Sequence, residues 1–445
     1  MSDRQMVLVG FLQAQNCSNY PASWRHPQSA QDFLSPKFYQ RIARTLEDGK
    51  FHLAFFDDRL AMPDIYGNDH AESVRNGVRV VKMDPVPIMA AMGAVTSKLG
   101  LGATCSTTYY EPFHVARTFA TLDLMTEGRA GWNVVTSLND SEARNMGADG
   151  TLEHDTRYDR ADEFMEVVLG HWAAWQPDAL VVDRDSGVFA DPDKVSRLDH
   201  QGTWFKSRGP FTVPPSAQRH PVVIQAGQSG RGRQFALKWG ELIFAIIPTL
   251  ELGQRLYAEM REEAVAMGRD PDSYRIAPAI YCTVAESQSI AQEKAALIES
   301  LAKPIDTLAL LSEALNFDFG SKAMDDPFSD EELASISGLH AIRDRVIRAS
   351  GKRNPTVADF VTYSGRGTVK EIPHFIGTPE RVADELQAWF EGRACDGFVL
   401  AATHVPGAYE EFVRLVVPEL QRRGLHQNDY QGTTLRENLG LPGFL

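Results

Sequence analysis

Short apolar runs alternate with amphipathic segments along the whole chain. Apolar runs bounded by turn residues are typical of buried strands, and apolar residues spaced three and four apart are typical of helices. Eight strand–helix units predict a (β/α)8 TIM barrel, a closed parallel barrel inside a ring of helices. A doubly wound open sheet is the alternative, and only the number of strands argues against it. The predicted strands are residues 6–12, 51–56, 100–104, 129–136, 221–226, 241–247, 275–284 and 396–401, and the predicted helices are 36–48, 85–98, 112–126, 157–175, 231–239, 250–267, 290–301, 379–392 and 408–423.

Two segments interrupt this alternation. Residues 182–215 are polar and rich in Asp, Gly and Pro, which predicts an insertion between a helix and a strand. Residues 303–371 separate the seventh strand from the eighth, and long segments of this kind in compact domains are usually functional lids or disordered linkers. We therefore expect one domain over residues 1–445, with these two insertions. The second insertion should be a helical lid, because apolar residues recur in it at helical spacing: Leu333, Ile336, Leu339, Ile342 and Val346.

The charge balance and the cysteines narrow the class of protein. Lys and Arg number 45 against 59 Asp and Glu, a net charge of 45 − 59 = −14 that disfavours binding to nucleic acid or anionic membranes. No apolar run reaches the ~20 residues of a membrane span, and the amino terminus lacks a signal-peptide pattern. The four cysteines lack CxxC spacing, which suits a reducing compartment. We expect a cytoplasmic protein that uses neither membrane nor nucleic acid.

Common catalytic motifs are absent from the sequence. No HExxH or HxH spacing occurs, so we expect no metal site. No GxSxG motif occurs either, which argues against a serine hydrolase of the α/β type.

Polar residues gather instead at the carboxyl ends of predicted strands, where α/β barrels build their sites. Asp58 follows the second strand, and Thr104 begins a hydroxyl cluster with Ser106, Thr107 and Thr108 at the end of the third. Ser137 follows the fourth strand. These groups could bind a cofactor, although helix capping is the favoured role for at least one of the hydroxyls, because a predicted helix begins nearby at Pro112.

Two further segments could hold a phosphate. The stretch QAGQSGRGR (225–233) follows a strand and opens a helix, so its small residues would let a phosphate approach a helix amino terminus. Ser229 lies within it, and a structural left-handed turn is the alternative explanation for its glycines. His154 precedes the predicted helix 157–175 and Tyr158 lies in its first turn. Both could bind the same anion, or the segment could only cap that helix. His26, after the first strand, is either a proton donor or a packed loop histidine.

Taken together, these segments resemble the bacterial-luciferase-like flavin monooxygenases. The resemblance is strongest to the subgroup that contains the nitrilotriacetate, pristinamycin synthase, long-chain alkane and dibenzothiophene-sulfone monooxygenases. It covers nearly the whole chain, in the same order, and is weakest over residues 303–371. The matching stretches are WRH (24–26), FYQRIARTLEDGKF (38–51), ATCSTTYYEPFHVARTFATLD (103–123), GWNVVTSLNDSEARN (131–145), LEHDTRYDRADEF (152–164), FADPDKV (189–195), PVVIQAGQSGRGR (221–233), GTPERVADEL (377–386) and TLRENLGLP (434–442).

The resemblance implies a TIM barrel that uses O2 and reduced FMN (FMNH2), supplied by a separate NAD(P)H:flavin reductase. It implies a homodimer or a dimer of dimers. Tyr158 and Ser229 are implied to hold the FMN phosphate, and His26 and Ser137 to position oxygen and move a proton. Further FMN-binding candidates are Asp58, Thr104, Asn133 and His154, and the candidates for an apolar substrate pocket, which could equally be barrel core, are Phe11, Phe56, Tyr110 and Phe244.

The phrases LNDSEARN and GVFADPDKV are most similar to the dibenzothiophene-sulfone enzyme. They imply an apolar, aromatic or organosulfur substrate and desulfurisation by C–S cleavage after oxygenation. One departure is NCSNY (16–20), which replaces a histidine-bearing stretch of the relatives. Aminopolycarboxylate, alkane, thioether and haloaromatic substrates remain alternatives. So do a deazaflavin-dependent dehydrogenase on the same barrel and a non-catalytic flavin-binding protein.

Overall fold

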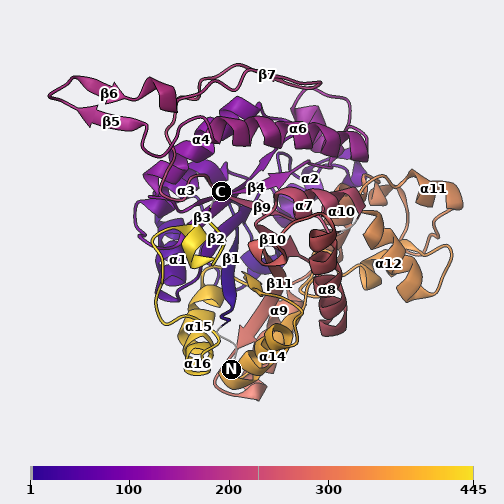
Figure 1. Cartoon of the computed structure of the whole chain (residues 1–445). Coiled ribbons are helices and arrows are strands. Elements are labelled where there is room, and N and C mark those ends of the chain that lie inside the picture. Colours follow the sequence, from indigo (N-terminus) through magenta and orange to yellow (C-terminus); the bar gives the residue numbers. More distant parts are fainter. Residues whose placement is uncertain (1–3, 229, 444–445) are drawn as a thin grey trace.

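A closed barrel of eight parallel strands forms the centre of the computed structural model, which describes residues 4–228 and 230–443 (Figure 1). Each strand pairs in parallel with the next, and β13 returns to β1, so that Val7 lies opposite Gly397. This confirms the TIM barrel and all eight predicted strands. Around the barrel they are β1 (Val7–Gln13), β2 (Leu53–Asp57), β3 (Gly100–Ser106), β4 (Ala130–Val135), β9 (Val222–Gln225), β10 (Leu242–Ala245), β11 (Arg275–Val284) and β13 (Gly397–Ala401).

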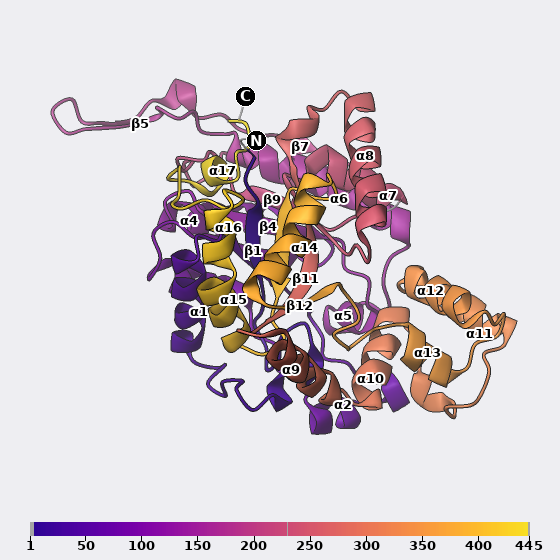
Figure 2. The ribbon, with the colours of Figure 1, turned by 90° about the horizontal axis from the view of Figure 1, so that it is seen from below.

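Helices surround the barrel, mostly where the pattern predicts them (Figures 1 and 2). The predicted helix 157–175 starts earlier, at His154, because the Glu153 carboxylate caps it by accepting a hydrogen bond from the backbone N–H of Thr156 at 2.9 Å. The predicted helix 408–423 is two helices that divide near Pro418, whose ring removes a backbone donor. The surrounding helices are α1 (Pro36–Asp48), α3 (Pro85–Gly93), α4 (Pro112–Met125), α6 (His154–Trp172), α7 (Gly230–Trp239), α8 (Leu250–Ala266), α9 (Gln288–Ser300), α14 (Pro379–Glu391), α15 (Gly407–Leu415) and α16 (Val417–Arg422).

Strand alternation divides the core into two layers. Residues such as Val9 and Phe11 of β1 point into the barrel, whereas Leu8 and Leu12 pack outward against the helices. The segment after α16 closes the amino-terminal end of the barrel. Its short helix α17 (Leu435–Asn438) and the residues that follow bury three leucines in the interior layer, and its Arg436 pairs with Glu241 at 3.1 Å. These leucines are Leu435, Leu439 and Leu441.

The first insertion consists of two small hairpins. The hairpin of β5 (Leu180–Asp183) and β6 (Val188–Ala190) projects from the body in both views, and β7 (His200–Gln201) pairs with β8 (Lys206–Ser207) (Figures 1 and 2). The remaining short elements are α2 (Ala71–Asn76), α5 (Asp140–Asn145), and the 3-10 helices Pro21–Arg25, Tyr66–Asn68, Pro192–Lys194, Pro271–Ser273 and Phe319–Ser321.

The second insertion is helical, as its spacing predicts. It comprises α10 (Pro304–Leu315), α11 (Asp330–Ser335), α12 (His340–Ser350) and α13 (Val357–Tyr363), on the side of the molecule opposite the β5–β6 hairpin (Figures 1 and 2). The pattern does not predict β12 (His374–Gly377), a short strand that pairs with the carboxyl end of β11 outside the barrel. No helix in the described residues is long and apolar enough to cross a membrane.

Candidate active site

Two predicted site residues meet at the carboxyl edge of the barrel. Thr104 of β3 lies opposite Asn133 of β4, and the Asn133 amide donates a hydrogen bond to the Thr104 hydroxyl at 2.8 Å. That hydroxyl donates in turn to the carbonyl of Phe56 at 2.8 Å. The Asn133 Oδ1 atom is buried and has no partner among the described residues. Because unpartnered buried acceptors are rare, this oxygen marks a place where a ligand donor fits.

Hydroxyl groups continue this edge above β3 and β4. The Ser137 hydroxyl donates to the Ser106 hydroxyl at 3.0 Å, and Thr108 donates to the carbonyl of Thr136 at 2.6 Å. Ser137 has φ of 52°, a left-handed conformation that is uncommon for a residue other than glycine. Such backbone conformations are concentrated at functional sites. Ser106 and Ser137 therefore form a second polar pair next to Thr104 and Asn133.

Asp58 follows β2 at the same edge. Its carboxylate accepts a hydrogen bond from the Arg59 backbone N–H at 2.8 Å. Burial raises the pKa of Asp58 to about 7, although Lys82 acts in the opposite direction. Lys82 donates to the Gln15 side chain at 3.2 Å, and burial lowers its pKa. Asp58 can therefore exchange a proton near neutral pH, which is unusual for a carboxyl group.

Tyr158 of α6 lies against the glycine-rich turn that opens α7. A Cβ atom on Gly232 would lie 2.7 Å from the Tyr158 hydroxyl, so only glycine leaves room for this contact. Burial raises the pKa of the Tyr158 phenol, which keeps it a hydrogen-bond donor at neutral pH. Its ring lies 5.1 Å from the ring of His154, which is exposed and contacts Asp155. Tyr158, His154 and the start of α7 thus come together, whereas Ser229 lies outside the described residues.

The arginines of the glycine-rich turn serve the packing of helices. Arg231 pairs with Asp159 and Asp162 of α6, and Arg233 pairs with carboxylates of α8, among them Glu259 at 3.2 Å. Both guanidinium groups are therefore already paired with carboxylates, although that of Arg231 lies 5.9 Å from the centroid of the Tyr158 ring.

Phe11 and Phe244, two of the predicted substrate-pocket residues, pack together inside the barrel. Their ring centroids are 5.1 Å apart, and Phe55 completes the cluster at 5.4 Å from Phe11 and 5.9 Å from Phe244. Phe56, another predicted pocket residue, points outward instead and packs near Tyr39 of α1. Successive strand residues face opposite sides, so Phe55 takes the inward position.

Tyr110 lies after β3 and is partly buried against the outer layer of the core. Burial raises the pKa of its phenol to about 12, with Cys105 and Asp58 acting in the same direction. Tyr110 is thus placed near the predicted site residue Asp58, at the edge of the barrel.

His26 stacks on His404, which follows β13, with ring centroids 4.1 Å apart. Burial lowers the pKa of His26 and lowers that of His404 to about 3, so both rings are neutral at pH 7. The pair lies between the ends of β1 and β13. Ser137 is at the end of β4, across the barrel in the strand order. The two predicted catalytic residues therefore lie on opposite sides of the barrel.

Sequence reasoning missed two buried groups near α6. Arg157 is buried, no carboxylate lies within ion-pair distance of it in the described chain, and its Nε atom lacks a partner. Tyr109 has a buried hydroxyl that is also unpartnered in the described structure. Arg157 stands in the motif HDTRYD, beside Tyr158, and this position was the only available signal.

Helix α10 covers one side of this edge. Arg25 forms a two-pronged ion pair with the fully buried Asp306 at 2.6 and 2.9 Å, and Asn139 donates to Glu313 at 2.7 Å. Both contacts join α10 to loops that follow barrel strands. The resulting site combines hydroxyl and amide groups, a carboxyl group of raised pKa and a cover against water. Such a site suits a ring-bearing ligand with an anionic tail.

Known proteins resemble this chain in sequence and in fold. The family model described as luciferase-like monooxygenase matches residues 17–397. The dibenzothiophene-sulfone monooxygenase of Rhodococcus erythropolis is 47% identical over 98% of this chain and 97% of its own length. The N-acetyl-S-(2-succino)cysteine monooxygenase of Bacillus subtilis (strain 168) is 38% identical over 99% and 98%. The crystal structure of DmoA from Hyphomicrobium sulfonivorans superposes with a TM-score of 0.88 at 34% identity, over 98% of this chain and 92% of that one.

Proposed function

The chain belongs to the luciferase-like monooxygenase family, and from that premise we propose that it is the oxygenase of a two-component system. A separate NAD(P)H:flavin reductase would supply FMNH2, and O2 would be the co-substrate. The proposed substrate is a small, apolar organosulfur compound of the sulfone class, with C–S cleavage after oxygenation. This substrate class rests on the 47% identity to the Rhodococcus enzyme.

The residues at the barrel edge fit FMN. Tyr158 and the amino terminus of α7 would bind the phosphate, because a phenol donor and exposed N–H groups suit an anion and Gly232 leaves the space. Asn133 would accept a hydrogen bond from the cofactor through its unpartnered Oδ1 atom. His154, Thr104 and Asp58 would complete the cofactor contacts, and Ser229 is proposed from the resemblance alone.

Reduced FMN, when bound, supplies the electrons that activate O2. The chain must then exclude water and place polar groups at the reacting atoms. Helix α10 would limit water access through its Arg25–Asp306 and Asn139–Glu313 contacts. Ser137 would offer a hydroxyl on one side of the site, and the neutral His26 ring would accept or donate a proton on the other.

The cellular setting follows from the same proposal. We place the enzyme in the cytoplasm, where a flavin reductase is available and where the four free cysteines stay reduced. A dimer, or a dimer of dimers, is the proposed assembly. Neither a membrane nor a nucleic acid is a proposed partner.

The single observation that carries the proposal is the Thr104–Asn133 pair, with its free acceptor, at the edge of a barrel of this family. The test is anaerobic titration with FMNH2, followed by rapid mixing with 18O2 and a sulfone such as dibenzothiophene sulfone. We expect FMNH2 to bind more tightly than oxidised FMN, and one labelled oxygen atom to enter the product. Binding of a deazaflavin in place of FMNH2, or a product without label, would overturn the proposal.

A further inference from the structure

Arg157, in the first turn of α6, differs from the other buried arginines of the described chain. It is only 9% exposed, yet its guanidinium group makes no hydrogen bond with any described residue. The other buried arginines all have partners, which are Asn19 for Arg79, the carbonyl of Leu99 for Arg129, Glu371 for Arg366 and Glu241 for Arg436. Because a buried cation without a partner is costly, the position of Arg157 indicates that a ligand supplies the missing acceptor.

The guanidinium group of Arg157 is free to meet such a ligand. Its Nε atom is enclosed, whereas its two terminal nitrogens have no partner among the described residues and remain accessible. Two carboxylates act on the pKa of Arg157, but each already accepts a hydrogen bond elsewhere. Glu153 accepts from the backbone N–H of Thr156 at 2.9 Å, and Glu142 accepts from that of Leu60 at 3.0 Å. The positive charge of Arg157 is therefore not offset by an ion pair within the described chain.

Tyr109 supplies a second donor near Arg157. It lies in the turn that follows β3, and its hydroxyl is buried without a hydrogen-bond partner in the described structure. Burial raises the pKa of Tyr109 to about 12, so the phenol keeps its proton at neutral pH, and Arg157 is among the charges that act on it. A guanidinium fork and a phenol O–H together suit an oxyanion, because charge-assisted hydrogen bonds to a guanidinium are the strong ones.

Arg157 and Tyr109 border the site where the cofactor is proposed to bind. Tyr158, the neighbour of Arg157 in sequence, lies against Gly232 at the start of α7. Tyr109 follows the hydroxyl cluster of β3, in which Ser106 accepts a hydrogen bond from Ser137 at 3.0 Å. An anion held by Arg157 and Tyr109 would therefore lie close to the groups proposed to bind FMN and oxygen.

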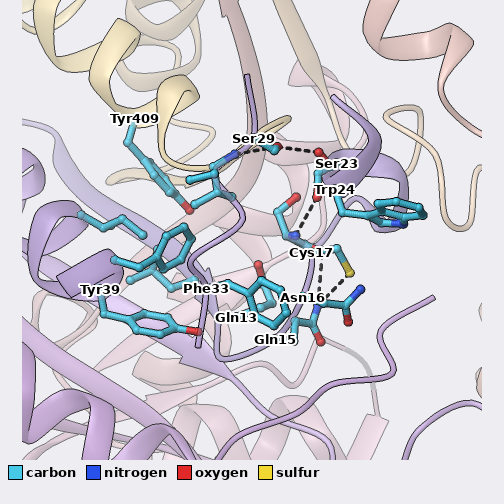
Figure 3. A pocket seen from close by; sticks show the side chains of 16 residues that line it. Gln13, Gln15, Asn16, Cys17, Ser23, Trp24, Ser29, Phe33, Tyr39 and Tyr409 are labelled. Carbon is cyan, nitrogen blue, oxygen red and sulfur yellow. Dashed lines mark hydrogen bonds between the residues drawn. The ribbon is translucent and has the colours of Figure 1, made fainter. Parts of the chain in front are cut away.

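Two hollows elsewhere in the structure match an oxyanion less well. The one drawn in Figure 3 lies in the outer layer beside β1, α1 and α15, and no charged side chain is among the described residues that line it. The other, beside β12, is lined by one arginine and one carboxylate, Arg381 and Glu385, whose charges oppose each other. The uncompensated positive charge is at Arg157.

We propose that Arg157 and Tyr109 bind an oxyanion that the chain itself does not supply, with the guanidinium group and the phenol donating hydrogen bonds to its oxygens. Two groups of the proposed reaction have this chemistry. One is the phosphate of FMN, and the other is the sulfinate that forms when cleavage of a sulfone leaves the C–S bonding pair on sulfur. The inference rests on the proposed function for these two sources, and it adds two residues to the proposed site.

Binding to the full-length protein without turnover distinguishes the two sources. Each anion is compared with an uncharged analogue: reduced FMN with reduced riboflavin, and benzenesulfinate with methyl phenyl sulfone. Anaerobic titration measures the flavins and calorimetry the sulfur compounds, at about 0.15 M salt so that exposed charges contribute little. Arg157→Gln should lower the preference for the anion at least about tenfold in one or both comparisons, and Tyr109→Phe about 3- to 10-fold in the same ones. A loss confined to FMN assigns the site to the phosphate, and a loss confined to benzenesulfinate assigns it to the product.

Arg160→Gln is the matched control. Arg160 lies one turn further along α6, donates to the carbonyl of Thr107 and lies 4.6 Å from the centroid of the Phe205 ring, so its guanidinium group is already satisfied. Both preferences of this variant should equal those of the wild type. Arg157→Lys keeps the charge but not the planar fork, and should retain part of the preference that Arg157→Gln loses.

Two results would overturn the inference. One is that Arg157→Gln and Tyr109→Phe leave both preferences unchanged. The other is that each variant weakens the anion and its uncharged analogue equally, which would show a structural role instead. The proposed function fails separately, if the reductase-coupled wild type incorporates no oxygen from O2.

Discussion

Replacing Asp58 by Asn should change how the stability of the protein depends on pH. Burial raises the pKa of Asp58 from 3.8 to about 7. The folded protein therefore holds a proton that the unfolded chain has already released, and this carboxyl group destabilises the fold progressively as pH rises from about 4 to about 7. Asn mimics the protonated form, carries no charge to bury, and should remove this dependence.

The magnitude follows from the two pKa values. The linkage relation gives a loss of stability that is about 2–3 kcal/mol larger at pH 8 than at pH 5. For 445 residues the unfolding entropy is about 0.9 kcal/mol per kelvin. The gain in Tm of Asp58→Asn over the wild type should therefore be about 3 °C larger at pH 8 than at pH 5.

Calorimetry or thermal circular dichroism without flavin, at matched ionic strength, would measure these Tm values. Asp178→Asn is the control, because Asp178 is exposed and its hydrogen bond to Lys194 lowers its pKa, so removing the carboxylate cannot produce a gain that grows with pH. A pH-independent difference between Asp58→Asn and the wild type would refute the reasoning. So would a gain that is larger at pH 5 than at pH 8.

Three further predictions concern the proposed cofactor site and its cover. Tyr158→Phe should weaken binding of FMNH2 about 3- to 10-fold but leave binding of reduced riboflavin unchanged, because only FMN carries the phosphate. Anaerobic titration of both flavins measures this, and an equal loss of affinity for both would contradict it. Asn133→Leu should weaken the binding of FMN and of riboflavin to the same extent, because it removes the Oδ1 acceptor. Fluorescence titration with the two oxidised flavins measures this, and an effect confined to FMN would contradict it. Asp306→Asn should make α10 less firmly held, because it leaves Arg25 without its carboxylate partner. We expect faster amide hydrogen exchange across α10 and more H2O2 released per FMNH2 consumed. Unchanged amide exchange would argue against a cover held by this ion pair.

The barrel was predictable because strands buried on both faces read as continuous apolar runs. Two such runs also place Thr104 beside Asn133, since adjacent parallel strands bring their carboxyl ends together. The same continuity conceals which way each side chain points. Phe55 and Phe56 are equally apolar, so the pattern cannot show that Phe55 faces the barrel interior and Phe56 the helices.

Features that depend on distant partners could not be predicted from local pattern. His26 and His404 stack although hundreds of residues separate them, and their low pKa values follow from that shared burial. The sequence places Arg157 in a motif but does not show that, among the described residues, no carboxylate lies within ion-pair distance of it. The unpartnered hydroxyl of Tyr109 likewise emerges only when every neighbouring side chain in the described structure is known.

The closure of the barrel by β13 and by residues 435–441 has a consequence for how the chain is made. Strand β1 pairs with β13, and Leu435, Leu439 and Leu441 fill the interior that β1 helps to form. During synthesis at about 5–20 residues per second, β1 leaves the ribosome roughly 20–80 s before its partner. For that time an apolar strand edge has no neighbour on one side, which invites aggregation. Slow translation or limiting chaperone capacity should therefore lower the soluble yield more than the stability of the finished barrel would suggest.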